Sequence, residues 1–227
     1  MIAILRDNWG FLLAGGFPAE PLGGMALNLI MAVLSFALVF PLAAGVALLR
    51  TRGRGTLFAA ATAYVYFARG VPLLMVVFWI YFFLPYLVGV PISGFLTIII
   101  ALTFYQTAFL SEVFRGGIAA LPAGQFEAAR SLGLRPAATW RRVILPQVFR
   151  NTLPGTLNQV VNMLKETSLG YVIGVGEVTY VTGQINGELL TRPLQVFACL
   201  AVLYFLLCFT ISQAAQALAR RHAAPSR

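Results

Sequence analysis

Long apolar runs, separated by short polar stretches, make up most of this chain. Five runs are long enough to cross a membrane, at roughly 22–49, 56–88, 92–114, 153–175 and 194–218. A helix needs about 20 mostly apolar residues to cross the hydrocarbon core of a bilayer. Because the apolar positions are continuous and do not alternate, they indicate helices and not a β-barrel. The pattern therefore predicts an all-α integral membrane protein with five transmembrane helices.

The second apolar run is too long for one straight span. It contains "ARGVPLL", residues 68–74, where Gly70 and Pro72 lie two positions apart. Proline removes a backbone donor and clashes with the preceding helical turn. We therefore expect this run to break or kink at Gly70–Pro72.

The two ends of the chain are expected to lie outside the membrane domain. Arg6, Asp7 and Pro18 interrupt the weakly apolar segment 1–21. This segment does not have the basic start and clean apolar centre of a cleaved signal peptide. We interpret it as an extracytoplasmic lead-in at the interface, followed by a transmembrane domain over 22–221 and a cytoplasmic tail over 222–227.

Composition supports the membrane class, and the placement of charge predicts the orientation. The chain is 59% hydrophobic and only 10% charged, with a net charge of +9. Most of the basic residues fall on one side of the five-span arrangement: Arg50, Arg52, Arg54, Arg115, Arg130, Arg135, Arg141, Arg142, Arg150, Arg220, Arg221 and Arg227. Basic loops stay cytoplasmic, so the N-terminus is predicted outside and the C-terminus inside. The positive charge is thus a topology signal, and no nucleic-acid partner is expected.

A polar, arginine-rich segment between the third and fourth spans is the largest cytoplasmic feature. "GQFEAARSLGL" is rich in helix-forming residues, and Gly133 is a natural stop. We expect an amphipathic helix of about three turns over 124–134. Such a helix either lies on the lipid surface or docks into a groove on a cytoplasmic partner.

Arg69, Glu112, Lys165 and Glu166 fall inside or near the ends of the predicted spans, where charge is costly. Glu112 and Arg115 are three positions apart, so they are expected to pair on one helix face. Arg69, Lys165 and Glu166 have two interpretations. They form a structural ion pair between helices, or they line a pathway in which a cation binds a substrate carboxylate.

Neutral polar residues in the third and fourth spans are further pathway candidates. Gln106 lies in the third span, between Tyr105 and Thr107. Asn158 and Asn162 are four positions apart in the fourth span, so they share a helix face and are expected to point together into the bundle. Hydrogen bonding between helices would explain the same residues equally well.

Three segments together resemble a known family. "SEVFRGGIAALPAGQFEAARSLGL", "RVILPQVFRNTLPGTLNQVVNMLKETSL" and "YVYFARGVPLL" are similar to the polar amino acid branch of ABC-importer permeases, with an EAA loop at about 121–146. The resemblance implies a five-helix permease paired with a second permease copy or a homologue. It also implies two ATPase subunits and an extracytoplasmic substrate-binding protein as partners. Within this chain it implies that Glu127, Ala128, Ala129 and Gly133 couple the permease to the ATPase.

The residues themselves agree that this chain binds no nucleotide. It has no G-x-x-x-x-G-K-[ST] segment and no Gly-Lys pair, so it cannot build the phosphate cradle of an ATPase. ATP and magnesium are therefore expected on a partner subunit. With one histidine, His222, no metal site is expected either.

The sequence thus favours a non-enzymatic permease that moves a polar amino acid across a bacterial or archaeal inner membrane by alternating access. Glutamate or aspartate is the candidate substrate, and another small polar solute is the alternative. A passive channel would leave the polar loop without a purpose. A membrane-embedded enzyme would need a nucleophile, base or metal set within a span, and the sequence shows none.

Overall fold

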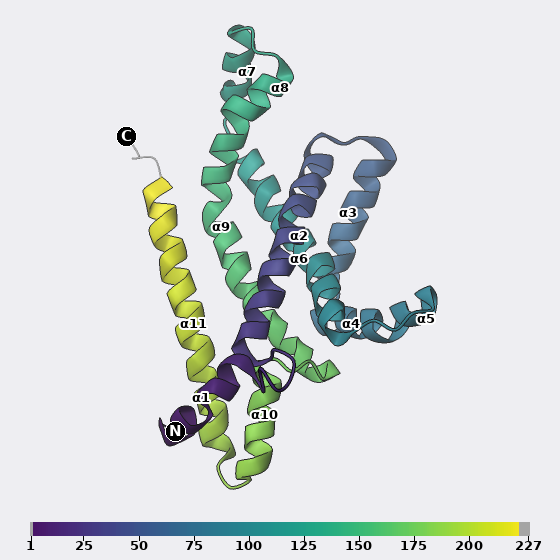
Figure 1. Cartoon of the computed structure of the whole chain (residues 1–227). Coiled ribbons are helices and arrows are strands. Elements are labelled where there is room, and N and C mark those ends of the chain that lie inside the picture. Colours follow the sequence, from purple (N-terminus) through teal and green to yellow (C-terminus); the bar gives the residue numbers. More distant parts are fainter. Residues whose placement is uncertain (1, 223–227) are drawn as a thin grey trace.

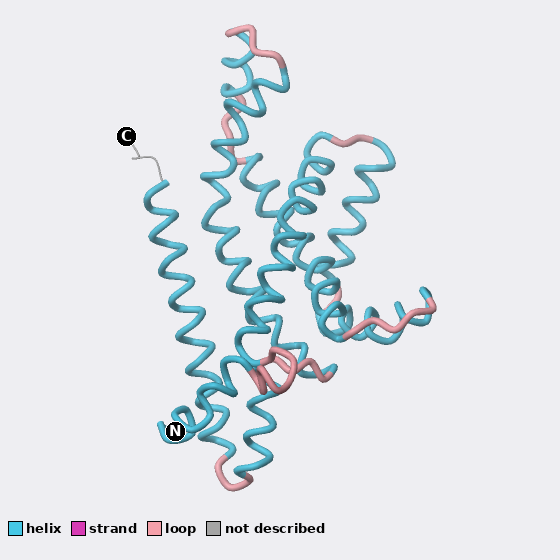
Figure 2. Tube along the Cα trace, viewed as in Figure 1, coloured by secondary structure: helices cyan, strands magenta, loops and turns pink. Residues whose placement is uncertain are grey.

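The computed structural model describes residues 2–222, and in that part of the chain the regular structure is helical (Figures 1 and 2). The elements are α1 (Ile2–Ala14), α2 (Gly24–Arg52), α3 (Gly55–Gly70), α4 (Leu73–Phe78), η1 (Trp79–Phe83), α5 (Leu84–Val88), α6 (Gly94–Ala119), α7 (Gly124–Ser131), α8 (Pro136–Thr139), η2 (Trp140–Ile144), α9 (Leu145–Glu166), η3 (Thr167–Ile173), α10 (Val178–Leu189) and α11 (Pro193–His222). The all-α prediction is confirmed. Apart from His222, the predicted tail lies outside the described residues.

Three described helices are long and apolar enough to cross a membrane: α2, α6 and the part of α11 over Pro193–Ala217. A fourth span results if α3 and the segment Leu73–Val88 are counted together. The fifth predicted span, 153–175, does not pass the same test. Its helix, α9, carries polar residues along its whole length, and the chain changes to a 3₁₀-helix at Thr167. The count of five spans therefore stays a prediction.

The predicted break in the second run is present. Helix α3 ends at Gly70, Val71 is extended, and α4 begins after Pro72. The two parts meet at an angle of 106°. The residue before a proline is held away from helical geometry, and the proline itself lacks the backbone donor. Consequently α4, η1 and α5 turn away from the axis of α3 (Figure 1).

The main core lies where α2 crosses α6, with α4 and α9 beside them. Met31, Leu102 and Met163 are among its fully buried side chains. Small residues allow the helices to approach closely. A Cβ atom added to Gly155 of α9 would lie 2.7 Å from the Val113 side chain of α6, so glycine is needed at this crossing.

The molecule has two distinct ends (Figure 1). One end carries α7, α8, the α2–α3 turn and the C-terminal end of α11, and the other carries α1 and α10. The predicted lead-in is a helix over most of its length, Ile2–Ala14. Leu12 of α1 is buried against Val178 and Val181 of α10 and Val196 of α11 in a second core.

Candidate coupling helix and translocation pathway

The polar loop contains a short helix that begins at Gly124 as expected and ends at Ser131, three residues before the predicted end. Helix α7 spans Gly124–Ser131, about two turns instead of the expected three. Gly133 follows with φ of +73°, a conformation that L-residues rarely adopt. The amide of Leu134 donates to the carbonyl of Ala129 at 3.1 Å, which closes the helix end. The turn at Gly133 therefore includes residues that the sequence predicted to form a third turn of the helix.

Helix α7 turns part of the predicted coupling set toward the surface. Glu127, Ala128 and Gly133 are exposed, whereas Ala129 is 3% exposed and anchors the helix. The Leu132 side chain is 80% exposed at the end of the same helix. This face therefore combines a carboxylate, small residues and one large apolar side chain, which suits docking into a groove.

The inner side of α7 rests on an aromatic contact that the sequence analysis did not identify. The Phe126 and Trp140 rings have centroids 6.0 Å apart, and Trp140 is buried with Ile144 and Val148. The Arg52 guanidinium carbon lies 4.0 Å from the centroid of the Trp140 ring, a cation–π contact. Since Arg52 ends α2, this contact joins the polar loop to the first span.

Glu112 is the centre of an ion cluster between α2, α3 and α6. The predicted pair with Arg115 is confirmed, with a distance of 2.9 Å. The Glu112 carboxylate also binds Arg50, whose side chain is 9% exposed, and lies 3.8 Å from Arg69. One carboxylate therefore interacts with three arginines from three helices. Spacing along one helix could reveal only the Arg115 contact.

Of the two interpretations of Arg69, Lys165 and Glu166, the structural ion pair between them does not form among the described residues. Arg69 lies near Glu112, with its guanidinium carbon 5.5 Å from the centre of the Phe109 ring. Glu166 instead accepts a hydrogen bond from the Gln106 amide. Lys165 is exposed and has no ion pair among the described residues. Adjacent residues on a helix point in different directions, so Lys165 and Glu166 do not act as one pair.

Lys165 and Glu166 nevertheless line a common open cavity. Its volume is about 340 Å³, and Asn162, Ser168 and Leu169 complete the lining. Lys165 and Glu166 supply an amine and a carboxyl group, and Asn162 and Ser168 add an amide and a hydroxyl group. The cavity can therefore accept a ligand that carries both an ammonium and a carboxylate.

Asn158 and Asn162 do not point together into the bundle, as the sequence analysis expected. Both are exposed on α9. Asn158 lines a separate cavity of about 170 Å³ with Ser212, Ala215 and Gln216 of α11, whereas Asn162 hydrogen-bonds Gln159 at 3.2 Å. The face that they share is turned outward because apolar residues of α9, such as Met163 and Leu164, occupy the core side.

A buried polar network lies at the end opposite α7. The Asn28 amide nitrogen donates to Glu177 and to Thr167 at 2.9 Å each, and the Asn28 oxygen accepts from the Val178 amide. Glu177 is fully buried and caps α10. Burial raises the pKa of the Glu177 carboxyl, while hydrogen bonds from the Thr179 amide and the Asn28 side chain oppose that rise. The sequence gives no local signal for this network, because Asn28 and Glu177 are 149 positions apart.

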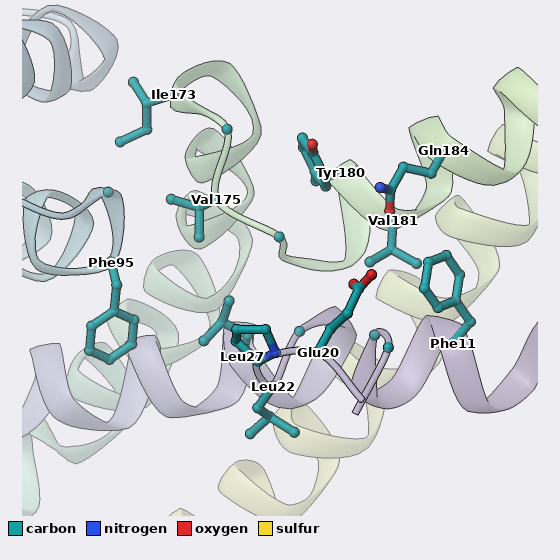
Figure 3. A pocket seen from close by; sticks show the side chains of 17 residues that line it. Phe11, Glu20, Leu22, Leu27, Phe95, Ile173, Val175, Tyr180, Val181 and Gln184 are labelled. Carbon is teal, nitrogen blue, oxygen red and sulfur yellow. The ribbon is translucent and has the colours of Figure 1, made fainter. Parts of the chain in front are cut away.

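The same end carries a cavity of about 480 Å³ (Figure 3). Its walls come from the α1–α2 connection, the start of α6 and the turn between η3 and α10. Glu20, Tyr180 and Gln184 supply polar groups, and Phe11 and Phe95 supply apolar surface. The Gly24 amide donates to the Gly176 carbonyl at 2.9 Å beside it. This hydrogen bond joins the α1–α2 connection to the turn between η3 and α10 beside the cavity.

Asn28→Ala is expected to destabilise this end by about 1–3 kcal/mol, because it leaves the buried Glu177 carboxylate and Val178 amide with fewer partners. Thermal unfolding of the purified protein measures the change. Ser35→Ala is the matched control on the same helix, since the Ser35 hydroxyl is buried and has no hydrogen-bond partner among the described residues. Equal melting temperatures for the two variants would show that the Asn28 network contributes nothing.

Apolar helices long enough to cross a membrane, an exposed helical loop, an ion cluster between helices and polar cavities are together typical of a membrane transport subunit. The model of the family described as "binding-protein-dependent transport system inner membrane component" matches residues 37–223, and the chain belongs to this family. It is a permease subunit of the cytoplasmic membrane, without catalytic activity of its own.

Relatives and a solved structure agree with this family. The chain is 37% identical over 196 residues to the octopine transport system permease protein OccM of Rhizobium meliloti, covering 83% of this chain and 80% of OccM. It is 33% identical over 212 residues to the probable glutamine ABC transporter permease protein GlnM of Bacillus subtilis (strain 168), covering 93% of each. A crystal structure of an amino acid ABC transporter with histidines superposes with a TM-score of 0.79 at 31% identity, covering 86% of this chain and 91% of the other.

Proposed function

We propose that this chain is the permease of an ATP-driven importer of polar amino acids, working by alternating access. The observation that carries the proposal is the similarity along most of the chain to permeases named for amino acids and their derivatives, together with a solved amino acid transporter. The cavity beside Lys165 and Glu166 supports the amino acid class, because it offers a partner to each charged end of a zwitterion. Glutamate and aspartate remain the candidate substrates.

The two ends of the molecule offer separate surfaces for the proposed partners. Two ATPase subunits bind ATP and magnesium. The face of α7 that contains Glu127, Ala128 and Leu132 docks onto an ATPase subunit. A second permease copy or a homologue completes the pathway. A substrate-binding protein docks at the end that carries α1, α10 and the cavity of Figure 3. Basic residues gather at the α7 end, which supports a cytoplasmic location for that end in a bacterial or archaeal membrane.

Competition for uptake tests the substrate class. Vesicles containing the whole transporter import a radiolabelled amino acid, and each unlabelled amino acid is added in turn at excess. Strongest competition by glutamate or aspartate supports an anionic substrate. Strongest competition by basic or neutral amino acids rejects that assignment and retains the amino acid class. If no amino acid competes, the proposed substrate class is wrong.

Arg69→Ala is expected to lower uptake at least about tenfold while the transporter still assembles. The Arg69 side chain is 44% exposed, and its distance to Glu112 is the longest in the ion cluster, so assembly does not depend on it. Uptake and recovery of the intact complex are measured together, with Arg54→Ala as an exposed control. Normal uptake would remove Arg69 from the pathway, and loss of the complex would give it a structural role.

A further inference from the structure

An apolar groove crosses the surface of the bundle where α2, α6 and α9 meet. Its volume is about 210 Å³, and its lining includes Phe40, Ala44, Phe114, Leu145, Phe149 and Thr152. The only hydroxyl in the lining, that of Thr152, donates to the Val148 carbonyl at 2.9 Å. The groove therefore offers no free hydrogen-bonding side chain, and hydrocarbon is the ligand that fits it.

The groove lies in the half of the bundle nearest to α7 and α8. Leu145 and Thr152 are seven positions apart on α9, so the groove follows the helix for about 10 Å. One leaflet of the hydrocarbon core is about 15 Å deep. The groove is thus short enough to lie within a single leaflet, with the end at Leu145 nearer to α8 in the chain.

Two arginines lie about one helical turn before the groove in the chain. Arg141 and Arg142 belong to the π-helix η2, and Leu145, which lines the groove, begins α9 directly after it. Both are exposed, and neither has an ion pair among the described residues, where all three pairs converge on Glu112. Between residues 113 and 150 the only acidic residue is Glu127. The two guanidinium groups are therefore available to an external anion.

We propose that this groove binds an anionic phospholipid, with one acyl chain between α2, α6 and α9 and the phosphate beside Arg141 and Arg142. A second permease copy fits the groove less well. A two-fold contact would bring the same arginine pair of both copies together, with repulsion between like charges. A stable protein interface also covers about 800 Å² on each partner, far more than a narrow slot provides. The inference rests on membrane insertion of the bundle and not on the transported substrate.

Native mass spectrometry of the purified complex, titrated with dioleoyl phosphatidylglycerol or dioleoyl phosphatidylcholine, tests this inference. The wild type is expected to retain the anionic lipid preferentially. Each basic residue near an anionic surface contributes about a fivefold preference, so Arg141→Gln with Arg142→Gln is expected to lower the preference about 30-fold. Arg135→Gln, an exposed arginine of the same loop, is the matched control and is expected to change it little.

A second variant tests the groove separately from the charge. Ala44→Phe fills the groove and leaves both arginines in place, so it is expected to reduce retention of phosphatidylglycerol. Equal retention of both lipids by the wild type, or an unchanged preference in the double arginine variant, would overturn the proposal. Disulfide cross-linking of two copies that carry Leu145→Cys would place a second permease on the groove and would overturn it as well. None of these lipid measurements depends on which solute is transported.

Discussion

Replacing Gly133 by valine is expected to uncouple ATP hydrolysis from uptake. Gly133 has φ of +73°, and its position after α7 sets the direction in which the chain returns toward the membrane. This conformation costs a residue with a Cβ atom about 1–2 kcal/mol, which lowers the population of the turn by a factor of roughly 5–30. The cost is larger for a β-branched residue. The turn should therefore open and displace the exposed face of α7.

The measurement compares ATP hydrolysis with uptake in vesicles that contain the whole transporter. In Gly133→Val, uptake per ATP hydrolysed is expected to fall at least about tenfold. Gly124→Ala is the control within the same helix, since an added Cβ atom there meets open space and needs no positive φ. Glu127→Lys reverses the charge of the exposed face without strain on the backbone and is also expected to uncouple. Normal coupling in both the Gly133 and Glu127 variants would remove α7 from the coupling role.

Glu112→Ala is expected to have the largest effect on the fold. The substitution leaves three arginines without their shared carboxylate, and the Arg50 side chain is only 9% exposed. Removing one partner of a buried ion pair costs about 3–5 kcal/mol, and partial exposure of Glu112 places this case toward the lower end of that range. We expect little folded permease to accumulate in the membrane.

Quantification of the membrane-inserted protein and its thermal unfolding checks this expectation. Glu188→Ala removes an exposed carboxylate of α10 and is expected to leave both quantities unchanged. Glu112→Gln keeps a hydrogen-bond acceptor but not the charge, so an intermediate loss is expected. If Glu112→Ala melts at the same temperature as the wild type, the ion cluster does not stabilise the fold.

Local features were the most predictable from the sequence. The break at Gly70–Pro72 follows from the missing donor of one proline. The end of α7 follows from a single glycine at a position with positive φ. The Glu112–Arg115 pair follows from spacing on one helix. Each depends on residues close together in the chain, where propensity and geometry act directly.

Contacts between distant segments were not predictable in this way. Arg50 and Arg69 reach Glu112 from two other helices, and Asn28 reaches Glu177 across 149 positions. The expected ion pair among Arg69, Lys165 and Glu166 is absent because membrane depth alone does not specify which helix faces which. Likewise, the spacing of Asn158 and Asn162 fixed a common face of α9 but not the direction of that face.

The α9 helix shows how composition can mislead about a span. Its apolar residues pack against α6 and α2, while Asn158, Asn162 and Lys165 are exposed and line two cavities. Such a helix lacks the continuous apolar surface of a lipid-exposed span. Its place in the membrane therefore depends on neighbouring helices, which a single sequence does not show. For that reason the fifth span and the overall orientation remain predictions.

ATP-dependent accumulation of a radiolabelled amino acid is the most direct test of the central claim. Sealed vesicles would contain this permease, its ATPase and its substrate-binding protein, with the labelled amino acid on the side of the binding protein. The account predicts accumulation above the external concentration only when ATP is supplied on the opposite side. Equilibration of the label to the same concentration on both sides, at the same rate with and without ATP, would contradict it and indicate a passive channel.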